Sequence, residues 1–188
     1  EDWLLQRRLS WNTISTYMRT LQAVYNRLSP PGTPEHNPRL FDDVYTKVKS
    51  QIKRALTEEQ MGRLMHADLD VLSEELQRVQ AYFLLMFLFR GMPFIDLAHL
   101  RKRDVKDGKI AYRRHKTGKQ ITLRIPREAL PLLKEFKDKD ETSLYLFPIL
   151  NAAPEGDDAL YECYQKALRN FNKMLRVLAK RLLPGIKI

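Results

Sequence analysis

The sequence predicts a mainly α fold with a small antiparallel β-sheet (α+β). Apolar residues recur at helical spacing before residue 30, between about 71 and 89, and after residue 157. Two short segments, 109–114 and 120–125, alternate apolar and polar residues as strands do. A turn-rich break at 29–34, followed by a connecting stretch, divides the chain into a small helical domain, 1–54, and a larger domain, 55–188.

Composition narrows the classes of partner and compartment. The chain has 188 residues, 33 Lys and Arg against 23 Asp and Glu, and a formal net charge of +10. This excess favours a polyanionic partner, nucleic acid before a membrane surface. The single cysteine, Cys163, excludes an internal disulfide framework and agrees with a reducing compartment. No signal peptide or transmembrane segment is evident, so we expect a cytoplasmic protein without membrane association.

The first domain is expected to be helical. Trp3–Leu5 read as the end of a helix, and Ser10 or Asn12 can cap the next one. Seven apolar residues of that helix fall at helical spacing: Ile14, Tyr17, Met18, Leu21, Val24, Tyr25 and Leu28. Asn12 and Thr13 begin its polar face, which also carries Thr16, Arg19 and Gln22 and which could touch phosphates or simply be solvated.

The second domain opens with Thr57-Glu-Glu-Gln60, a capping-box pattern that starts a helix. The next helix runs from near Val71 to Phe89. Its last eight residues, from Tyr82, are all apolar or aromatic, so we expect burial on every side, in a segment too short to span a membrane. Gly91 and Pro93 stop it and leave Arg90 at its tip. Position alone fits an arginine that merely complements the helix dipole, a gain of about 0.3–1 kcal/mol.

The two strands form a hairpin with a basic tip. Asp107-Gly108 turns the chain into the first strand, and Gly118 serves the turn between the two. The apolar residues Ile110, Tyr112, Ile121, Leu123 and Ile125 are expected to face inward. The tip and its flanks, RRHKTGK, carry up to five positive charges in seven residues, so we expect this tip to meet an anion.

Further elements follow the hairpin. A short helix is expected around Leu130, Leu133 and Phe136, and a brief extended or turn segment at 144–150. Asp157 or Asp158 can cap a last long helix that ends near Pro184-Gly185. Its cations are more typical of a solvated face than of a DNA footprint. His66 and His99 are expected to lie in helices as ordinary polar residues.

One stretch resembles a known family. Four segments carry the resemblance: Arg90-Gly-Met-Pro-Phe-Ile-Asp-Leu-Ala-His-Leu, then Arg103-Asp-Val, a hairpin with Lys116-Thr-Gly-Lys, and a closing Leu123-Arg-Ile-Pro. Together they resemble the catalytic domain of tyrosine recombinases, the phage-integrase family, and especially integrases of bacterial mobile elements. The resemblance implies Arg90 as the first catalytic arginine, Lys116 as the hairpin lysine and Asp96 as the acidic residue that follows the arginine. It also implies that residues 1–54 belong to a helical core-binding domain, which Asn37-Pro38 closes.

The chemistry of such enzymes suits these residue types. A tyrosine hydroxyl attacks a phosphodiester of double-stranded DNA and forms a 3′-phosphotyrosyl intermediate. Arginine's planar fork matches the non-bridging oxygens, and a hairpin lysine can protonate the departing 5′ oxygen. We therefore take Arg90 and Lys116 as catalytic candidates, and His115, Thr117 and Lys119, with Asn12 and Thr13, as DNA-binding candidates. We find no metal-ligand spacing and expect no metal or other cofactor.

The family pattern is incomplete here. His36-Asn-Pro-Arg39 spells His-x-x-Arg but lies in a proline-containing loop before everything catalytic, so we do not assign it to the second arginine. Tyr161 and Tyr164 come too early for the nucleophile. We therefore expect an inactive, monomeric fragment of a nucleoid-associated bacterial recombinase that would act as a homotetramer on DNA.

Three other interpretations stay open. A type IB topoisomerase shares the arginine and lysine chemistry, although the compact first domain favours a recombinase. A non-catalytic DNA-binding protein of the same fold would keep the positive surface and lack a nucleophile. In a basic protein-interaction module, Arg90 would only tie helices together, and binding to DNA would lack the steep salt dependence of phosphate contacts.

Overall fold

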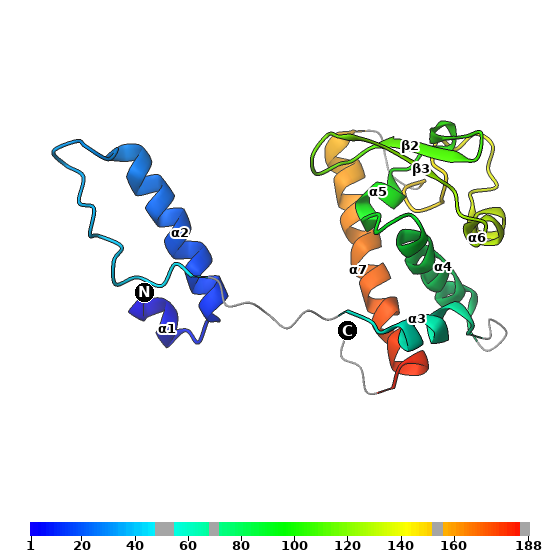
Figure 1. The fold of residues 1–188 in the computed structure, drawn as a ribbon, viewed down its shortest axis with the longest axis horizontal. Helices are drawn as coiled ribbons and strands as arrows, with labels where there is room; N and C mark the ends of the chain where they lie inside the picture. The colour runs from blue at the N-terminus through cyan, green and yellow to red at the C-terminus, as the bar shows by residue number, and fades with distance from the viewer. Residues whose placement is uncertain (48–54, 68–71, 152–155, 185–188) are drawn as a thin grey trace. The chain divides into compact units, whose positions relative to one another are not determined.

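The computed structural model divides the chain into two compact units, Glu1–Arg54 and Ala55–Ile188. It describes residues 1–47, 55–67, 72–151 and 156–184. Over these residues the fold is mainly helical, with seven α-helices and one three-stranded antiparallel sheet, as expected (Figure 1). None of the helices in this part of the chain is long and apolar enough to cross a membrane. The identities of the two units as core-binding and catalytic domains remain predictions.

The first unit is built on one long helix. Helix α1 spans Asp2–Gln6 and helix α2 spans Trp11–Leu28. Ser10 rather than Asn12 caps α2, since its hydroxyl accepts the Thr13 N–H at 3.2 Å. Only part of the expected apolar stripe is buried: Ile14 and Met18 are covered, whereas more than half of the surface of four others remains exposed (Tyr17, Leu21, Val24 and Leu28).

The loop after α2 folds back on its last turns. The His36 ring stacks on Tyr25 at a centroid distance of 5.5 Å, and His36 Nδ1 lies 2.8 Å from the Ser29 carbonyl oxygen. The Tyr25 hydroxyl accepts the Asn37 N–H at 2.6 Å. The His36–Arg39 sequence therefore lies in a loop and not on a helix, as expected.

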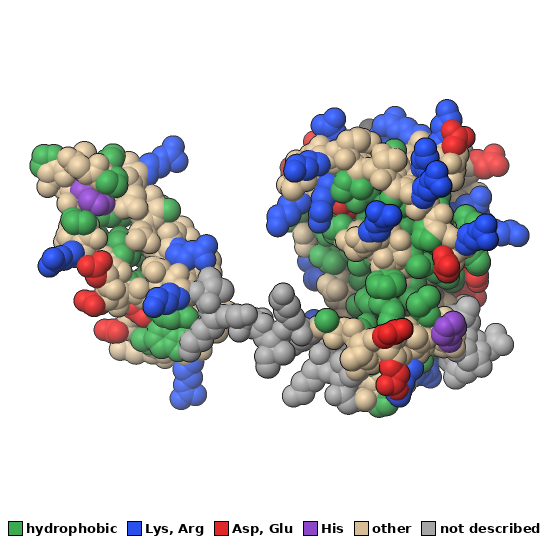
Figure 2. All heavy atoms as spheres, in the orientation of Figure 1, with side chains coloured by type: hydrophobic (Ala, Val, Ile, Leu, Met, Phe, Trp, Pro, Cys, Tyr) green, Lys and Arg blue, Asp and Glu red, His purple; other side chains and the backbone are tan. Residues whose placement is uncertain are grey.

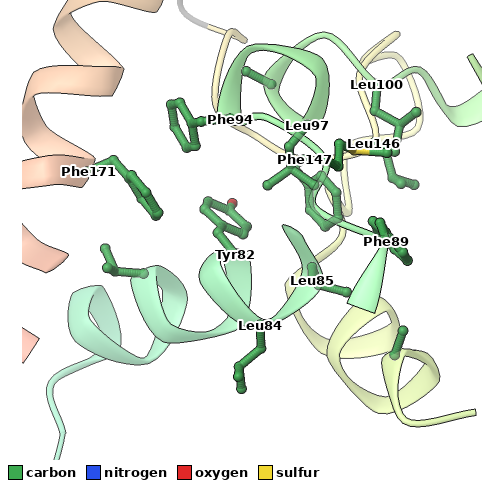
Figure 3. Close-up of a cluster of buried hydrophobic side chains, with 14 of the residues drawn as sticks. Tyr82, Leu84, Leu85, Phe89, Phe94, Leu97, Leu100, Leu146, Phe147 and Phe171 are labelled. Carbon is green, nitrogen blue, oxygen red and sulfur yellow. The ribbon is translucent and has the colours of Figure 1, made fainter. Parts of the chain in front are cut away.

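The second unit is organised around helix α4, Glu74–Leu88. Helices α3 (Glu58–Met65), α5 (Phe94–Ala98), α6 (Ala129–Phe136) and α7 (Asp157–Leu182) all contact α4. Figure 3 shows side chains of α4, α5 and α7 converging on one core, in which the Phe94 and Phe171 rings stack 4.4 Å apart. The predicted capping box is confirmed: Thr57 Oγ1 accepts the Gln60 N–H and Gln60 Oε1 accepts the Thr57 N–H.

Helix α4 departs from its prediction in two ways. It begins at Glu74, after Ser73, while Val71 lies outside the described residues. Burial on every side is wrong, because Phe87 is 51 % exposed and Phe83 is half-buried. These two residues are four apart and lie on one side of the helix, where Phe83 packs against the edge of the core and Phe87 extends beyond it.

The sheet has the order β1-β2-β3, with strands Val105–Lys106, Lys109–Arg113 and Gln120–Arg124. Ile110 pairs with Leu123 and both are buried, which confirms the predicted inward face. Strand β1 was not predicted. Asp107 and Gly108 both have positive φ, 50° and 68°, and make the two-residue turn that joins β1 to β2. A 3-10 helix, Lys102–Asp104, precedes β1.

Two further expectations are corrected at helix ends. The N-cap of α7 is Gly156, so Asp157 and Asp158 lie in the first turn of the helix and are not its N-cap. His66 and His99 are the C-cap residues of α3 and α5 and do not lie inside those helices. The expected brief extended or turn segment at 144–150 is present as bends and turns, with one bridge between Tyr145 and Arg101.

Candidate nucleic-acid interface

Arg90 is held in an unusual backbone conformation at the end of α4. Its φ is +61°, and Gly91 follows with φ +75°. Hydrogen bonds from the Arg90 and Gly91 N–H groups to the carbonyls of Phe87 and Met86, both at 3.0 Å, close the helix end. A left-handed conformation costs a non-glycine residue about 1–2 kcal/mol, so the fold keeps a strained arginine where glycine would be relaxed.

The Arg90 side chain is available to a ligand. The residue is exposed, whereas Phe89 before it is 1 % exposed and anchors the helix end in the core. Within the described ranges the Arg90 guanidinium makes no ion pair, and the pair found there is Arg63–Glu59 on α3. An arginine that only ties helices together would have a partner inside the protein.

The hairpin presents its charges on an ordered loop. The Arg114 N–H donates to the Lys119 carbonyl at 2.8 Å, and the Gly118 N–H donates to the Arg114 carbonyl at 2.8 Å. Gly118 has φ +67°, which supports its predicted place in the turn. The loop side chains are exposed at His115, Lys116, Thr117 and Lys119, and the Lys116 ammonium has no hydrogen-bond partner within the described part of the chain.

Asp96 ties this loop to α5. The residue is 4 % exposed, and its Oδ1 accepts the His115 N–H at 2.9 Å. The other oxygen, Oδ2, is buried without a hydrogen-bond partner among the described residues. Only Gly91–Pro93 separate Arg90 from the start of α5. His115, the residue before Lys116, is therefore hydrogen-bonded to α5, the short helix that follows Arg90.

Two histidines meet beside this bond. The rings of His99 and His115 lie 5.3 Å apart, and His99 Nδ1 is 2.9 Å from the Ile95 carbonyl oxygen. Burial lowers the pKa of His99 below its usual value, and the neighbouring His115 lowers it further. Both rings line a cavity of about 210 Å³ together with Ile95, Asp157, Leu160, Tyr161 and Tyr164.

The structure thus brings together residues that the sequence did not connect. Asp96, His99 and His115 form one contact group, although His99 was expected to be an ordinary helical residue. The spacing of Asp96 and His99, three residues apart on a short helix, was the available signal. No hydrogen bond or ion pair joins the side chains of Arg90 and Lys116 among the described residues, and each lies a few residues along the chain from a member of this group.

Asn12 and Thr13 lie in the other unit, in the first turn of α2. The Thr13 hydroxyl lies 2.8 Å from the Ser10 hydroxyl, and the Asn12 carbonyl accepts the Thr16 hydroxyl at 2.9 Å. Both residues are half-buried. The Thr13 hydroxyl and the Asn12 backbone carbonyl therefore have partners within the first unit. The role of both residues in DNA binding remains a prediction.

Positive charge is common on the surface of the second unit. Figure 2 shows many Lys and Arg side chains over the part of this unit where Figure 1 labels β2 and β3. Within the described ranges no group of three or more His, Cys, Asp or Glu residues is placed to hold a metal ion.

Comparisons with known proteins add no relative: no protein family, curated protein or solved structure was found to match the chain. The functional assignment therefore depends on the residues and their geometry.

Proposed function

We propose that residues 55–188 are the DNA-binding, arginine- and lysine-bearing part of a tyrosine recombinase, which performs site-specific DNA recombination or integration. One observation carries this proposal. Arg90 is a strained, exposed arginine with no ion pair among the described residues, and it leads within a few residues into the helix whose Asp96 holds the base of a basic hairpin. A left-handed backbone also occurs at Arg8 and Asp107, so the proposal depends on its combination at Arg90 with the adjoining bond between Asp96 and the hairpin.

Arg90 would act on the phosphodiester. Its guanidinium can donate two parallel hydrogen bonds to the non-bridging oxygens, which gain negative charge as a tyrosine hydroxyl attacks phosphorus. The bond between phosphorus and the 5′ oxygen then breaks. Lys116 would donate a proton to that oxygen as it leaves, so no free alkoxide accumulates.

The remaining parts of the reaction are not assigned to this sequence. Tyr164 is 7 % exposed and packs near Phe94, and burial raises the pKa of its hydroxyl, as expected for a core tyrosine. Tyr161 is 61 % exposed, but it lies on α7 beside the histidine cavity. We propose neither residue as the nucleophile, and a second catalytic arginine is likewise left unassigned.

The test of Arg90 uses the full-length protein that carries this sequence. Arg90→Lys should leave duplex binding nearly unchanged, whereas strand cleavage should fall by about 10²–10³, as on loss of one preorganised donor. Arg103→Lys, at an exposed arginine in the neighbouring 3-10 helix, is the matched control and should cleave at the wild-type rate. Wild-type cleavage by Arg90→Lys would refute the catalytic role.

The test of Lys116 uses the leaving group. Lys116→Ala should slow cleavage of ordinary DNA, and a substrate with sulfur in place of the departing 5′ oxygen should restore the rate, because a thiolate leaves without protonation. Lys119→Ala is the matched control on the same loop and should gain nothing from the sulfur substrate. Equal rates on both substrates for Lys116→Ala would limit this lysine to DNA positioning.

A second candidate is a non-catalytic double-stranded DNA-binding protein of the same fold. The exposed cations of the hairpin loop, such as Lys116 and Lys119, would serve such a protein equally well. Trapping of the full-length protein that carries this sequence on a nicked duplex distinguishes the two candidates. A recombinase leaves a covalent protein–DNA product that survives denaturing electrophoresis, and a binding protein leaves none.

A further inference from the structure

The outward face of the sheet carries a concentration of positive charge distinct from the hairpin tip. On β2 and β3 buried or half-buried residues alternate with exposed ones, so that each strand presents every second residue to solvent. By the strand register, Lys106 pairs with Lys109, and Lys109 pairs with Arg124. Arg113 lies at the other end of the exposed side of β2, where this face meets the flank of the hairpin tip. We call Lys106, Lys109, Arg113 and Arg124 the basic sheet face.

No acidic side chain pairs with these charges in the ranges that the structure describes. Like charges directly opposite each other destabilise a sheet, and here Lys109 has a cation on each side. None of the four residues makes an ion pair within 4.0 Å in the parts of the chain that the structure describes. Because the arrangement opposes folding, an external anion is the partner that would make it favourable.

We propose that the basic sheet face is a second line of contacts to the phosphate backbone of double-stranded DNA, in addition to the hairpin tip. The proposal builds on the DNA-binding function proposed above. Adjacent strands lie about 4.8 Å apart, so cations paired across three strands form a row about 10 Å long. A duplex carries one negative charge per about 1.7 Å of its axis, so each cation in such a row can reach a phosphate.

The composition of the face selects the kind of nucleic acid and the kind of recognition. Its other exposed residues are Ala111, Gln120 and Thr122. Binding of single strands uses aromatic platforms on which bases stack, and this face has none. Contacts from lysine and arginine to phosphates position a duplex without reading its bases. The face is therefore suited to holding duplex DNA of any sequence.

The test measures duplex binding by the whole chain as a function of salt, by fluorescence anisotropy. Lys109→Gln combined with Arg124→Gln should lower the slope of log K against log salt by about 0.9 per phosphate contact, or about 1.8 in all. Taking equal affinities at 1 M salt as the reference, this change in slope corresponds to a roughly 60-fold loss of affinity at 0.1 M salt. Lys173→Gln combined with Arg176→Gln, at exposed cations of α7, changes the net charge equally and should leave the slope nearly unchanged.

Two further variants separate the possible results. Lys116→Gln combined with Lys119→Gln removes charge from the hairpin tip. If it weakens binding while the sheet-face variant behaves as the α7 control does, the inference is overturned and the proposed function stands. If the wild-type chain shows no salt-dependent duplex binding, both fail. Lys109→Arg combined with Arg124→Lys retains the charges and should bind as the wild type does; weak binding by this variant would also overturn the inference.

Discussion

Asp96 joins the basic hairpin to α5, and its replacement tests that connection. Its Oδ1 accepts the His115 N–H at 2.9 Å, and the side chain is 4 % exposed. A hydrogen bond to a charged group contributes about 1.5–3 kcal/mol, and one between neutral groups about 0.5–1.5 kcal/mol. Asp96→Asn keeps an acceptor and loses the charge, so the free energy of unfolding should fall by about 1 kcal/mol. Asp96→Ala loses the bond as well and should cost about 2 kcal/mol.

The assay must report on the second unit. Both tryptophans, Trp3 and Trp11, lie in the first unit, so tryptophan fluorescence would not report on the second. Far-UV circular dichroism in denaturant and hydrogen exchange of the His115 amide are the suitable measurements. In Asp96→Ala this amide should exchange faster than in the wild type, because its acceptor is gone. Asp104→Asn is the matched control: Asp104 accepts the Arg101 N–H at 2.9 Å, and its loss should leave His115 exchange unchanged. Wild-type exchange at His115 in Asp96→Ala would refute the connection.

Three other predictions concern the frame around the site. Phe94→Ala removes a ring that stacks on Phe171 at 4.4 Å, and the free energy of unfolding in denaturant should fall by about 3–5 kcal/mol. Thr57→Ala removes half of the capping box with Gln60 and should cost about 1 kcal/mol in the same measurement. The folded pKa of His99 is lowered by burial, so the unfolded chain takes up the proton first and stability should fall as the pH drops through about 6.5. His99→Gln should flatten that part of the pH profile of unfolding; an unchanged profile would exclude His99 as its source.

The sequence predicted elements whose signals are local. The capping box at Thr57, the stop at Gly91 and the alternation around Ile110 each depend on residues a few positions apart, and the structure has these features where they were expected. Strand β1 could also have been predicted, because Asp107-Gly108 is a typical two-residue hairpin turn. It was missed because Val105–Lys106 is too short to show alternation.

The features that depend on tertiary packing could not be predicted. The hydrogen bond from His115 to Asp96 joins residues 19 apart, and no periodicity links a loop to a helix at that distance. The exposure of Phe87 follows from which faces of α4 the other helices cover, and hydrophobicity alone does not determine that. The N-cap of α7 is Gly156, whose own φ is +117°, a conformation that aspartate rarely adopts.

Arg90 offers a test in which stability and function are expected to change in opposite directions. Arg90→Gly relieves a left-handed conformation that costs a non-glycine residue about 1–2 kcal/mol, while the added freedom of glycine in the unfolded chain returns about 0.5–1 kcal/mol of that gain. The side chain is exposed and unpaired within the described residues, so its removal costs little packing. The net result should be a free energy of unfolding about 0.5 kcal/mol higher, together with loss of strand cleavage in the full-length protein. Arg90→Ala lacks the guanidinium and keeps the strain, so it should lose cleavage without gaining stability. A glycine variant less stable than the alanine variant would mean that the backbone at residue 90 is not strained.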